Sequence, residues 1–140
     1  MTEQVVEGFE LSRQQRRIWS MQDNGDAFQS QCAILLEGAL NKRALRQALQ
    51  IAIASHEILR TSFRSLSGMK FPIQVISEDA DAPALNECDL NCELEELLLE
   101  ELRTPFDLDA PSLIRCKLLN LSQDRHVLIL GQPALCADAE

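Results

Sequence analysis

Side chains that could transfer a proton are scarce in this chain of 140 residues. It contains two histidines, His56 and His126, so any histidine-dependent catalysis must use one of them. The glycines stand alone and form no phosphate-binding loop, and the sequence has no Gly-x-Ser-x-Gly nucleophile motif. The sequence therefore disfavours nucleotide binding through a glycine-rich loop and hydrolysis by a serine in a Gly-x-Ser-x-Gly motif. It also leaves few candidates for general acid–base catalysis.

The five cysteines form no recognised metal or redox motif. Their number is odd and no Cys-x-x-Cys pair occurs, which argues against a disulfide framework. A zinc site would need Cys88 and Cys92 with distant histidines, a spacing that matches no zinc finger or ribbon. Cys136 has Asp138 nearby but no adjacent histidine to activate its thiol. We expect reduced thiols packed as small hydrophobic residues, and no bound metal.

The composition predicts a folded protein. Hydrophobic residues make up 46% of the chain, enough for one domain core or for a large piece of a bigger domain. The formal net charge is −9, from 22 acidic and 13 basic residues, which disfavours nucleic-acid binding. No apolar run approaches the roughly 18 residues of a membrane span, and the polar, acidic first residues do not resemble a signal peptide. We therefore expect a cytoplasmic protein without nucleic-acid or membrane partners.

Two helices are predicted from their N-terminal caps. Ser12 and Gln15 can form a reciprocal capping box, which predicts a helix from Arg13 to about Gln22. Asn41 can cap a second helix. Its apolar residues recur at the spacing of one buried stripe: Leu45, Ala48, Leu49 and Ala52.

A third helix is predicted after an acidic segment. Residues 77–91 are rich in acids and contain Pro83, so we expect a solvent-exposed loop there. Asn91 can cap the helix that follows, and Pro105 ends it. The expected buried face consists of Leu94, Leu97, Leu98 and Leu102. The expected outer face consists of Glu95, Glu96, Glu100 and Glu101.

Strands account for the remaining apolar segments. Residues 32–36 form a continuous apolar run, as expected for a strand buried on both faces. Residues 55–63 are predicted to form an extended, strand-like segment directly after the second helix. Residues 71–76 are predicted to form a strand that runs back after a turn. Residues 114–121 and 126–130 are predicted to form an antiparallel hairpin. This order of elements predicts one mixed α/β unit with helices packed on a sheet.

The first helix also carries the first of four motifs. Leu11-Ser-Arg-Gln-Gln-Arg-Arg-Ile-Trp19 resembles the Ser-x-x-Gln-x-Arg-Leu-Trp opening of nonribosomal peptide synthetase condensation domains. The matched residues are Ser12, Gln15, Arg17 and Trp19. As an apolar anchor of this helix, Trp19 is expected to be a core residue rather than a stacking platform.

A second, more specific stretch follows the second helix. It resembles the family's Arg-His-Glu-x-Leu-Arg-Thr-x-Phe, with Ser55 in place of the leading arginine. The six matched residues are His56, Glu57, Leu59, Arg60, Thr61 and Phe63. The resemblance implies a supporting role for the histidine of this motif rather than a catalytic one.

A third stretch is similar to the family's Pro-Phe-Asp-Leu-x-x-x-Pro-Leu-x-Arg. It contains Phe106 and Asp107, followed by Pro111, Leu113 and Arg115. The resemblance covers residues 10–140, preceded by a lead-in of residues 1–9. It implies a partial condensation domain, an incomplete α/β lobe of chloramphenicol-acetyltransferase-like architecture that is truncated after the motif at Asp138.

The fourth stretch departs from the family pattern. Where the family has His-His-x-x-x-Asp-Gly, this chain has Pro133-Ala-Leu-Cys-Ala-Asp-Ala139. Asp138 sets the register, so Pro133 and Ala134 occupy the two histidine positions. In the family the second histidine serves as a base or positions the attacking amine, and Ala134 cannot accept a proton. The resemblance therefore identifies no catalytic residue here, and it implies that Asp138 pairs with Arg60 to brace the loop.

Two functional hypotheses follow from this resemblance. In the first, the chain is a fragment of a condensation domain whose parent joins a carrier-bound acyl or peptidyl thioester to a carrier-bound amine. Its partners would be carrier proteins with their phosphopantetheine arms and neighbouring synthetase domains, and it would bind no cofactor directly. In the second, which the replacement at Ala134 favours, the parent is a noncatalytic module that binds carrier proteins or a tailoring enzyme. Because the family's active site lies between two lobes, this chain alone is expected to be inactive.

Overall fold

The computed structural model describes residues 7–22, 28–78 and 85–137. Within these ranges the helices are α1 (Arg13–Met21), α2 (Lys42–Ser55) and α3 (Leu94–Arg103), with two short 3-10 helices, η1 (Glu57–Arg60) and η2 (Ala134–Cys136). The strands are β1 (Gln29–Glu37), β2 (Thr61–Arg64), β3 (Ile73–Ile76), β4 (Leu85–Asp89), β5 (Arg115–Ser122) and β6 (Arg125–Pro133). None of the helices in this part of the chain is long and apolar enough to cross a membrane.

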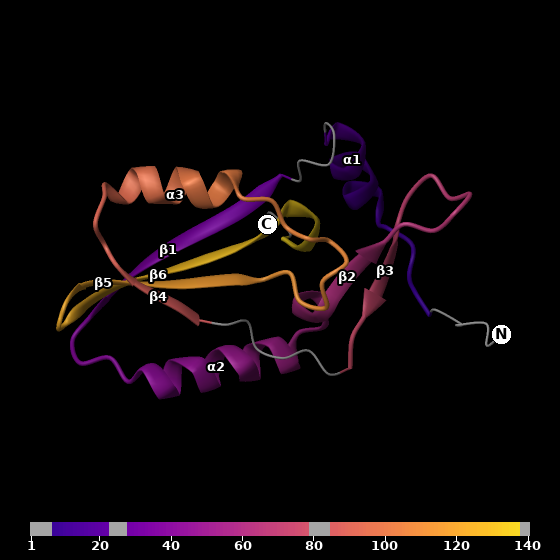
Figure 1. The fold of residues 1–140 in the computed structure, drawn as a ribbon. Coiled ribbons are helices and arrows are strands. Elements are labelled where there is room, and N and C mark those ends of the chain that lie inside the picture. The colour runs from indigo at the N-terminus through magenta and orange to yellow at the C-terminus, as the bar shows by residue number, and fades with distance from the viewer. Residues whose placement is uncertain (1–6, 23–27, 79–84, 138–140) are drawn as a thin grey trace.

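The main sheet has four strands in the order β1-β6-β5-β4. β1 and β5 both pair antiparallel with β6, whereas β4 pairs parallel with β5, so the sheet is mixed. Helix α3 lies over one face of this sheet and α2 lies on the opposite face (Figure 1). The arrangement confirms the predicted α/β class and the predicted hairpin, which β5 and β6 form.

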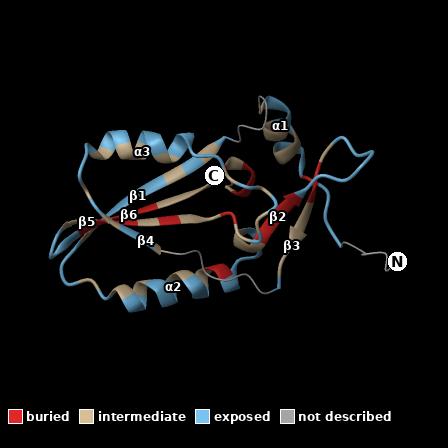
Figure 2. Ribbon diagram, in the orientation of Figure 1, coloured by how far each residue is buried: buried red, intermediate tan, exposed pale blue. Residues whose placement is uncertain are grey.

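The core of the main sheet is formed by β5 and β6, whose side chains alternate between the two faces. On one face, Leu119, Val127 and Ile129 contact the apolar side of α3. The cross-strand neighbours Leu118 and Leu128 belong to the other face and are also buried. Figure 2 shows buried stretches of β5 and β6 in red. Burial of these side chains removes apolar area from water and so stabilises the packing of the helices on the sheet.

A smaller sheet, formed by β2 and β3, lies at one end of the main sheet (Figure 1). The two strands pair antiparallel, and Phe9 adds an isolated bridge to Gln74 of β3. A second buried cluster adjoins this sheet and consists of Leu11, Phe63, Leu113, Leu135 and Cys136. Because the cluster joins the start of α1, the β2 strand and η2, it fixes the elements that surround the candidate site.

The acidic segment before α3 is not the continuous loop predicted from its composition. Residues 85–89 form β4, which pairs in parallel with β5. On this strand Glu87 binds Lys42 and Arg46 of α2, with N–O distances of 2.7 and 3.0 Å. The hydrogen bond from Lys42 lowers the pKa of Glu87. Charged residues are compatible with β4 because it is an edge strand of the sheet.

β1 is also an edge strand, so the prediction that residues 32–36 are buried on both faces is wrong. Among the described strands it pairs with β6 alone, and the side chains of Ile34 and Leu35 are 40% and 49% exposed. Cys32 is exposed as well, so not every thiol is packed as predicted. An apolar run alone cannot distinguish an edge strand from a central one, because both require similar β-propensity.

Several smaller predictions differ from the structure. The segment after α2 contains η1 before β2 rather than one continuous extended stretch. Helix α3 has Glu93 at its N-cap instead of Asn91, without a side-chain capping bond. Glu101 is half-buried, because it forms ion pairs with Lys117 and Arg115. Two side chains expected on buried helix faces are exposed, Ala48 and Leu102.

Candidate functional site

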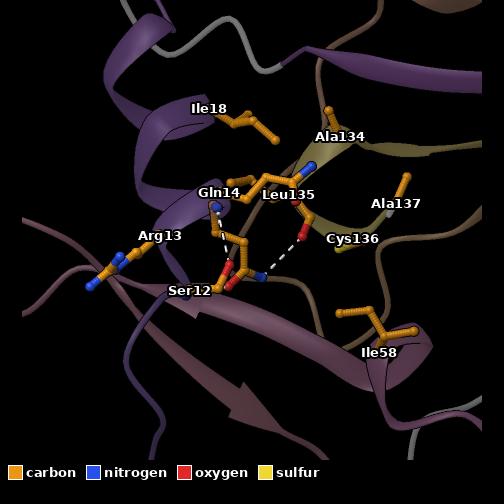
Figure 3. Close-up of a pocket in the computed structure, with 10 residues that line it drawn as sticks. Ser12, Arg13, Gln14, Ile18, Ile58, Ala134, Leu135, Cys136 and Ala137 are labelled. Atoms are coloured by element: carbon orange, nitrogen blue, oxygen red, sulfur yellow. Dashed lines mark hydrogen bonds between the residues drawn. The ribbon is translucent and has the colours of Figure 1, made fainter. Parts of the chain in front are cut away.

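The start of α1 is fixed by its N-terminal cap. Ser12 Oγ accepts a hydrogen bond from the backbone N–H of Gln15 at 3.1 Å, and Gln15 Oε1 accepts from the backbone N–H of Ser12 at 2.8 Å. This reciprocal capping box confirms the prediction from the sequence. The first turn of α1 forms one wall of a pocket, and η2 with Ala137 forms another (Figure 3).

The backbone at the end of β6 is held by hydrogen bonds. Pro133, the last residue of β6, is buried, and Ala134 begins η2. The N–H of Ala134 donates to the carbonyl of Phe28 at 2.6 Å, and the N–H of Ala137 donates to the carbonyl of Ala134 at 3.3 Å. Position 134 therefore has a defined place beside α1, although its side chain is a single methyl group.

The pocket between these walls has a volume of about 490 Å³. It is lined by the first turn of α1, by Ile18 and Ile58, and by residues 134–137 (Figure 3). Among the described residues, this lining offers amides, a hydroxyl, a guanidinium and a thiol, but no histidine or carboxylate. The pocket therefore offers apolar and polar contacts, whereas these residues supply no general base at neutral pH.

Cys136 borders the pocket, but its thiol is protonated at neutral pH. The residue is 7% exposed, and burial raises its pKa from the ordinary 9.0 to about 12. Burial likewise raises the pKa of Cys116, in the core of the main sheet, to about 11. Because the thiolate is the nucleophilic form, Cys136 is suited to packing rather than to attack on a substrate.

Above pH 9 the protein should become less stable as the pH rises. In the unfolded chain Cys116 and Cys136 ionise near their ordinary pKa of 9.0, whereas in the folded protein they keep their protons up to about pH 11 and 12. The unfolded state therefore loses protons first, and the free energy of unfolding decreases with pH. Urea unfolding in a reducing buffer between about pH 7 and pH 10 measures this decrease.

Variants of two cysteines separate this effect from other alkaline ionisations. Replacing Cys136 with alanine should flatten the dependence of unfolding free energy on pH, because one buried thiol is removed. Replacing the exposed Cys32 with alanine should leave it unchanged. An unchanged slope in the Cys136→Ala variant would contradict the assignment.

Arg60, the last residue of η1, binds three backbone carbonyls. Its Nε donates to Ile53 O at 3.2 Å, Nη1 donates to Ser77 O at 2.8 Å, and Nη2 donates to Ala54 O at 3.4 Å. The guanidinium thereby joins the C-terminal end of α2 to the end of β3. Asp138 lies outside the described residues, so the pairing of Arg60 with Asp138 stays a prediction.

The other motif residues of the first two stretches do not line the pocket beside Ala134. Trp19 is half-buried and packs against the cluster around Phe63, whereas Arg17 is exposed. His56 and Glu57 are both exposed at the junction of α2 and η1. Neither residue lines this pocket, and the supporting role that the resemblance implies for His56 stays a prediction.

The third motif forms the turn that leads into β5. The guanidinium of Arg115 lies over the half-buried ring of Phe106, 4.0 Å from its centroid, a favourable cation–π arrangement. Asp107 is exposed, and its Oδ1 accepts from the backbone N–H of Asp109 at 3.1 Å. This stretch therefore shapes the chain between α3 and the sheet.

His126 lies at the far end of β6 from the pocket. It is buried at the start of the strand, whereas Ala134 follows the strand's last residue. An extended strand of this length separates the two positions, so His126 cannot act at position 134. Within the described residues, no three His, Cys, Asp or Glu side chains are grouped to hold a metal ion.

Sequence reasoning missed Gln74, which lies in β3 among apolar residues. Its amide exchanges two hydrogen bonds with the amide of Gln15, at 2.9 and 3.0 Å. The sequence indicates this contact only by placing one amide within an apolar strand, because a polar side chain in such a place usually has a hydrogen-bond partner.

The profile of the condensation domain matches residues 6–138, nearly the whole chain. The chain belongs to the condensation-domain family. Gramicidin S synthase 2 from Brevibacillus brevis is 36% identical to it over 114 residues, which are 81% of this chain and 2% of the synthase. This condensation-domain chain is therefore similar to one small part of a nonribosomal peptide synthetase.

Solved structures of relatives have the same fold as this condensation-domain chain. SgcC5 from Streptomyces globisporus matches with a TM-score of 0.78 and 28% identity, over 92% of this chain and 32% of that one. The X-domain in complex with OxyB, from teicoplanin biosynthesis, matches with a TM-score of 0.71 and 28% identity, over 94% of this chain and 29% of that one. The chain thus spans about a third of each of these two structures, and the predicted chloramphenicol-acetyltransferase-like architecture is confirmed.

Proposed function

We propose that the domain to which this chain belongs receives carrier-bound substrates in a nonribosomal peptide synthetase and joins an acyl or peptidyl thioester to an amine. The match of the condensation-domain profile to residues 6–138 and the 36% identity to a gramicidin synthase support this assignment. Both substrates would arrive on the phosphopantetheine arms of carrier proteins, with neighbouring synthetase domains as further partners. The domain itself would bind no cofactor and would act in the cytoplasm.

The observation that carries the proposal is the pocket beside Ala134. It adjoins the segment that aligns with the family's histidine motif, and it combines apolar side chains such as Ile18 and Ile58 with the polar first turn of α1. Ligand pockets commonly combine an apolar lining with a few polar groups that orient the ligand. A thioester and an amine held here would lie beside position 134.

Catalysis in this pocket would depend on bringing the two reactants together. Ala134 carries no proton-accepting group, and general acid–base assistance is typically worth about 10² to 10⁴ in rate. Holding two tethered reactants in an aligned geometry can itself lower the barrier by roughly 7–11 kcal/mol in favourable cases. We therefore expect amide formation that is slow for the family but faster than the reaction of the free carriers.

A second function, a noncatalytic binding module, is favoured by the same replacement. In the register that the resemblance implies, Pro133 and Ala134 take the places of the family's two histidines. The surrounding fold is retained. One relative, the X-domain, forms a complex with OxyB. A domain of this kind would retain its binding surfaces for carriers or for a tailoring enzyme, and it would form no amide.

Carriers loaded with their thioesters distinguish the two functions. The complete protein is mixed with a donor carrier and an acceptor carrier from the same synthetase, and the carrier-bound product is followed by mass spectrometry. Amide formation above the rate of the carriers alone is the expected result. Carrier binding without product would assign the noncatalytic function, and absence of both binding and product would overturn the proposal.

A further inference from the structure

The side-chain amide of Gln15 uses all of its hydrogen-bonding capacity. Nε2 donates to Gln74 Oε1 at 2.9 Å and to the carbonyl of Leu135 at 3.1 Å. Oε1 accepts from the backbone N–H of Ser12 at 2.8 Å and from Gln74 Nε2 at 3.0 Å. A glutamine amide has two donor hydrogens and two acceptor lone pairs, so no further bond is available.

The orientation of this amide is determined by its neighbours. The backbone N–H of Ser12 can only donate, so the atom of Gln15 that faces it must be the oxygen. The nitrogen then points to the carbonyl of Leu135, which can only accept. Rotating the amide by 180° would place two donors together at Ser12 and two acceptors together at Leu135. The network therefore has one satisfied arrangement.

Gln15 thus connects elements that are far apart in the sequence. Through Gln74 it is linked to β3, and Gln74 Nε2 also donates to the carbonyl of Glu10 at 3.1 Å. Through the Leu135 carbonyl it is linked to η2, 120 residues away. Leu135 lies directly between Ala134 and Cys136, so its carbonyl lies at the centre of the segment that borders the pocket.

We propose that Gln15 is a positioning residue, which holds residues 134–136 against α1 and thereby fixes where the side chain at position 134 lies in the pocket. The relevance to catalysis rests on the proposed function, whereas the positioning itself can be measured without turnover. η2 is a single turn, and Ala137 N–H to Ala134 O is its internal bond in the described residues. Without Gln15, the half-buried Leu135 carbonyl would lose the donor that joins it to α1.

The thiol of Cys136 reports directly on this segment. It follows Leu135 and is buried in the folded protein, as is Cys116 in the distant main sheet. In the Gln15→Glu variant, the carboxylate can still accept from Ser12 but can no longer donate to Leu135, and oxygen faces oxygen. The rate of alkylation of Cys136 should then increase about ten-fold or more, as measured by peptide mass spectrometry on the complete protein. A ten-fold change corresponds to the free energy of about one lost hydrogen bond. Cys116 should stay as protected as in the unmodified protein.

Gln14→Glu is the matched control, because it makes the same chemical change one residue away. Gln14 also lines the pocket, but its side chain makes no hydrogen bond within the described residues. This variant should leave Cys136 protected. If Gln15→Glu is too unstable to purify, Gln15→Met removes the same donor without adding a charge and should give the same selective effect. Unchanged protection of Cys136, or equal loss of protection at Cys116 and Cys136, would overturn the proposal.

A spectroscopic signature separates positioning from general support of the fold. A histidine introduced by Ala134→His can be followed through its imidazole NMR signals. Adding Gln15→Glu should shift and broaden these signals, because the segment that carries the ring is released from α1. Adding Gln14→Glu should leave them in place. Identical spectra in the two double variants would count against a role for Gln15 at position 134, whether or not the protein forms amides.

Discussion

Replacing Ala134 with histidine should increase the rate of amide formation by the complete protein about 10²- to 10⁴-fold, the usual contribution of general acid–base catalysis. Position 134 lies in the pocket wall, and an imidazole there would replace a methyl group that cannot accept a proton. Its ordinary pKa of about 6.5 would let it act as a base at neutral pH. Single-turnover assays with loaded carriers should show a rate that rises with pH through this value, a dependence absent without the substitution.

A single substitution is preferable to restoring both family histidines. Pro133 is fully buried at the end of β6, so an imidazole in its place would crowd the core and introduce a buried polar group. Ala134 is half-buried and borders a pocket with room for the ring. Ala137→His is the matched control, because Ala137 lines the same pocket three residues later. Equal rates for the two variants, or no increase in Ala134→His while carriers still bind, would show that position 134 is not the site of a lost base.

The parts of the fold that the sequence predicts correctly depend on residues close together in the chain. The capping box joins Ser12 to Gln15, and the β5–β6 hairpin joins strands that follow one another directly. β4 was missed because its stability comes from pairing with β5 beyond α3, and its polar residues Asn86 and Glu87 have low strand propensity. The edge position of β1 was missed for a related reason, since an apolar run records β-propensity but not the number of neighbouring strands.

The candidate site shows the same division between local and distant information. A local motif of seven residues identifies position 134 as the counterpart of the family's second histidine. The structure places Ala134 in a pocket wall. The other wall comes from α1, more than a hundred residues earlier in the chain. Gln74 and Gln15 meet across 59 residues, and no periodicity or cap in the sequence reports that contact. Pairwise side-chain bonds between distant segments depend on the packed fold, so one sequence alone does not reveal them.

Replacing Arg60 with alanine should destabilise the protein by about 3 kcal/mol or more, the sum expected from losing two or three charge-assisted hydrogen bonds. The guanidinium binds Ile53 O, Ala54 O and Ser77 O, and two of these carbonyls lie at the C-terminal end of α2, where a positive charge is favourable. Thermal unfolding should show a melting temperature lower by roughly 10 °C or more. Arg64→Ala, an exposed arginine on the next strand, is the control and should change it little.

Two further variants identify which property of Arg60 matters. Arg60→Lys keeps the charge, but a single ammonium cannot reproduce the planar fork that reaches three carbonyls, so most of the stability that Arg60 contributes should still be lost.

The predicted pair with Asp138 is tested by a double-mutant cycle of Arg60→Ala and Asp138→Ala. If the pair is buried, the coupling energy should exceed about 1 kcal/mol, because each single variant leaves its partner's charge uncompensated. Additive effects would assign the stabilisation to the three carbonyls alone, and a melting temperature unchanged by Arg60→Ala would exclude both interactions as contributors.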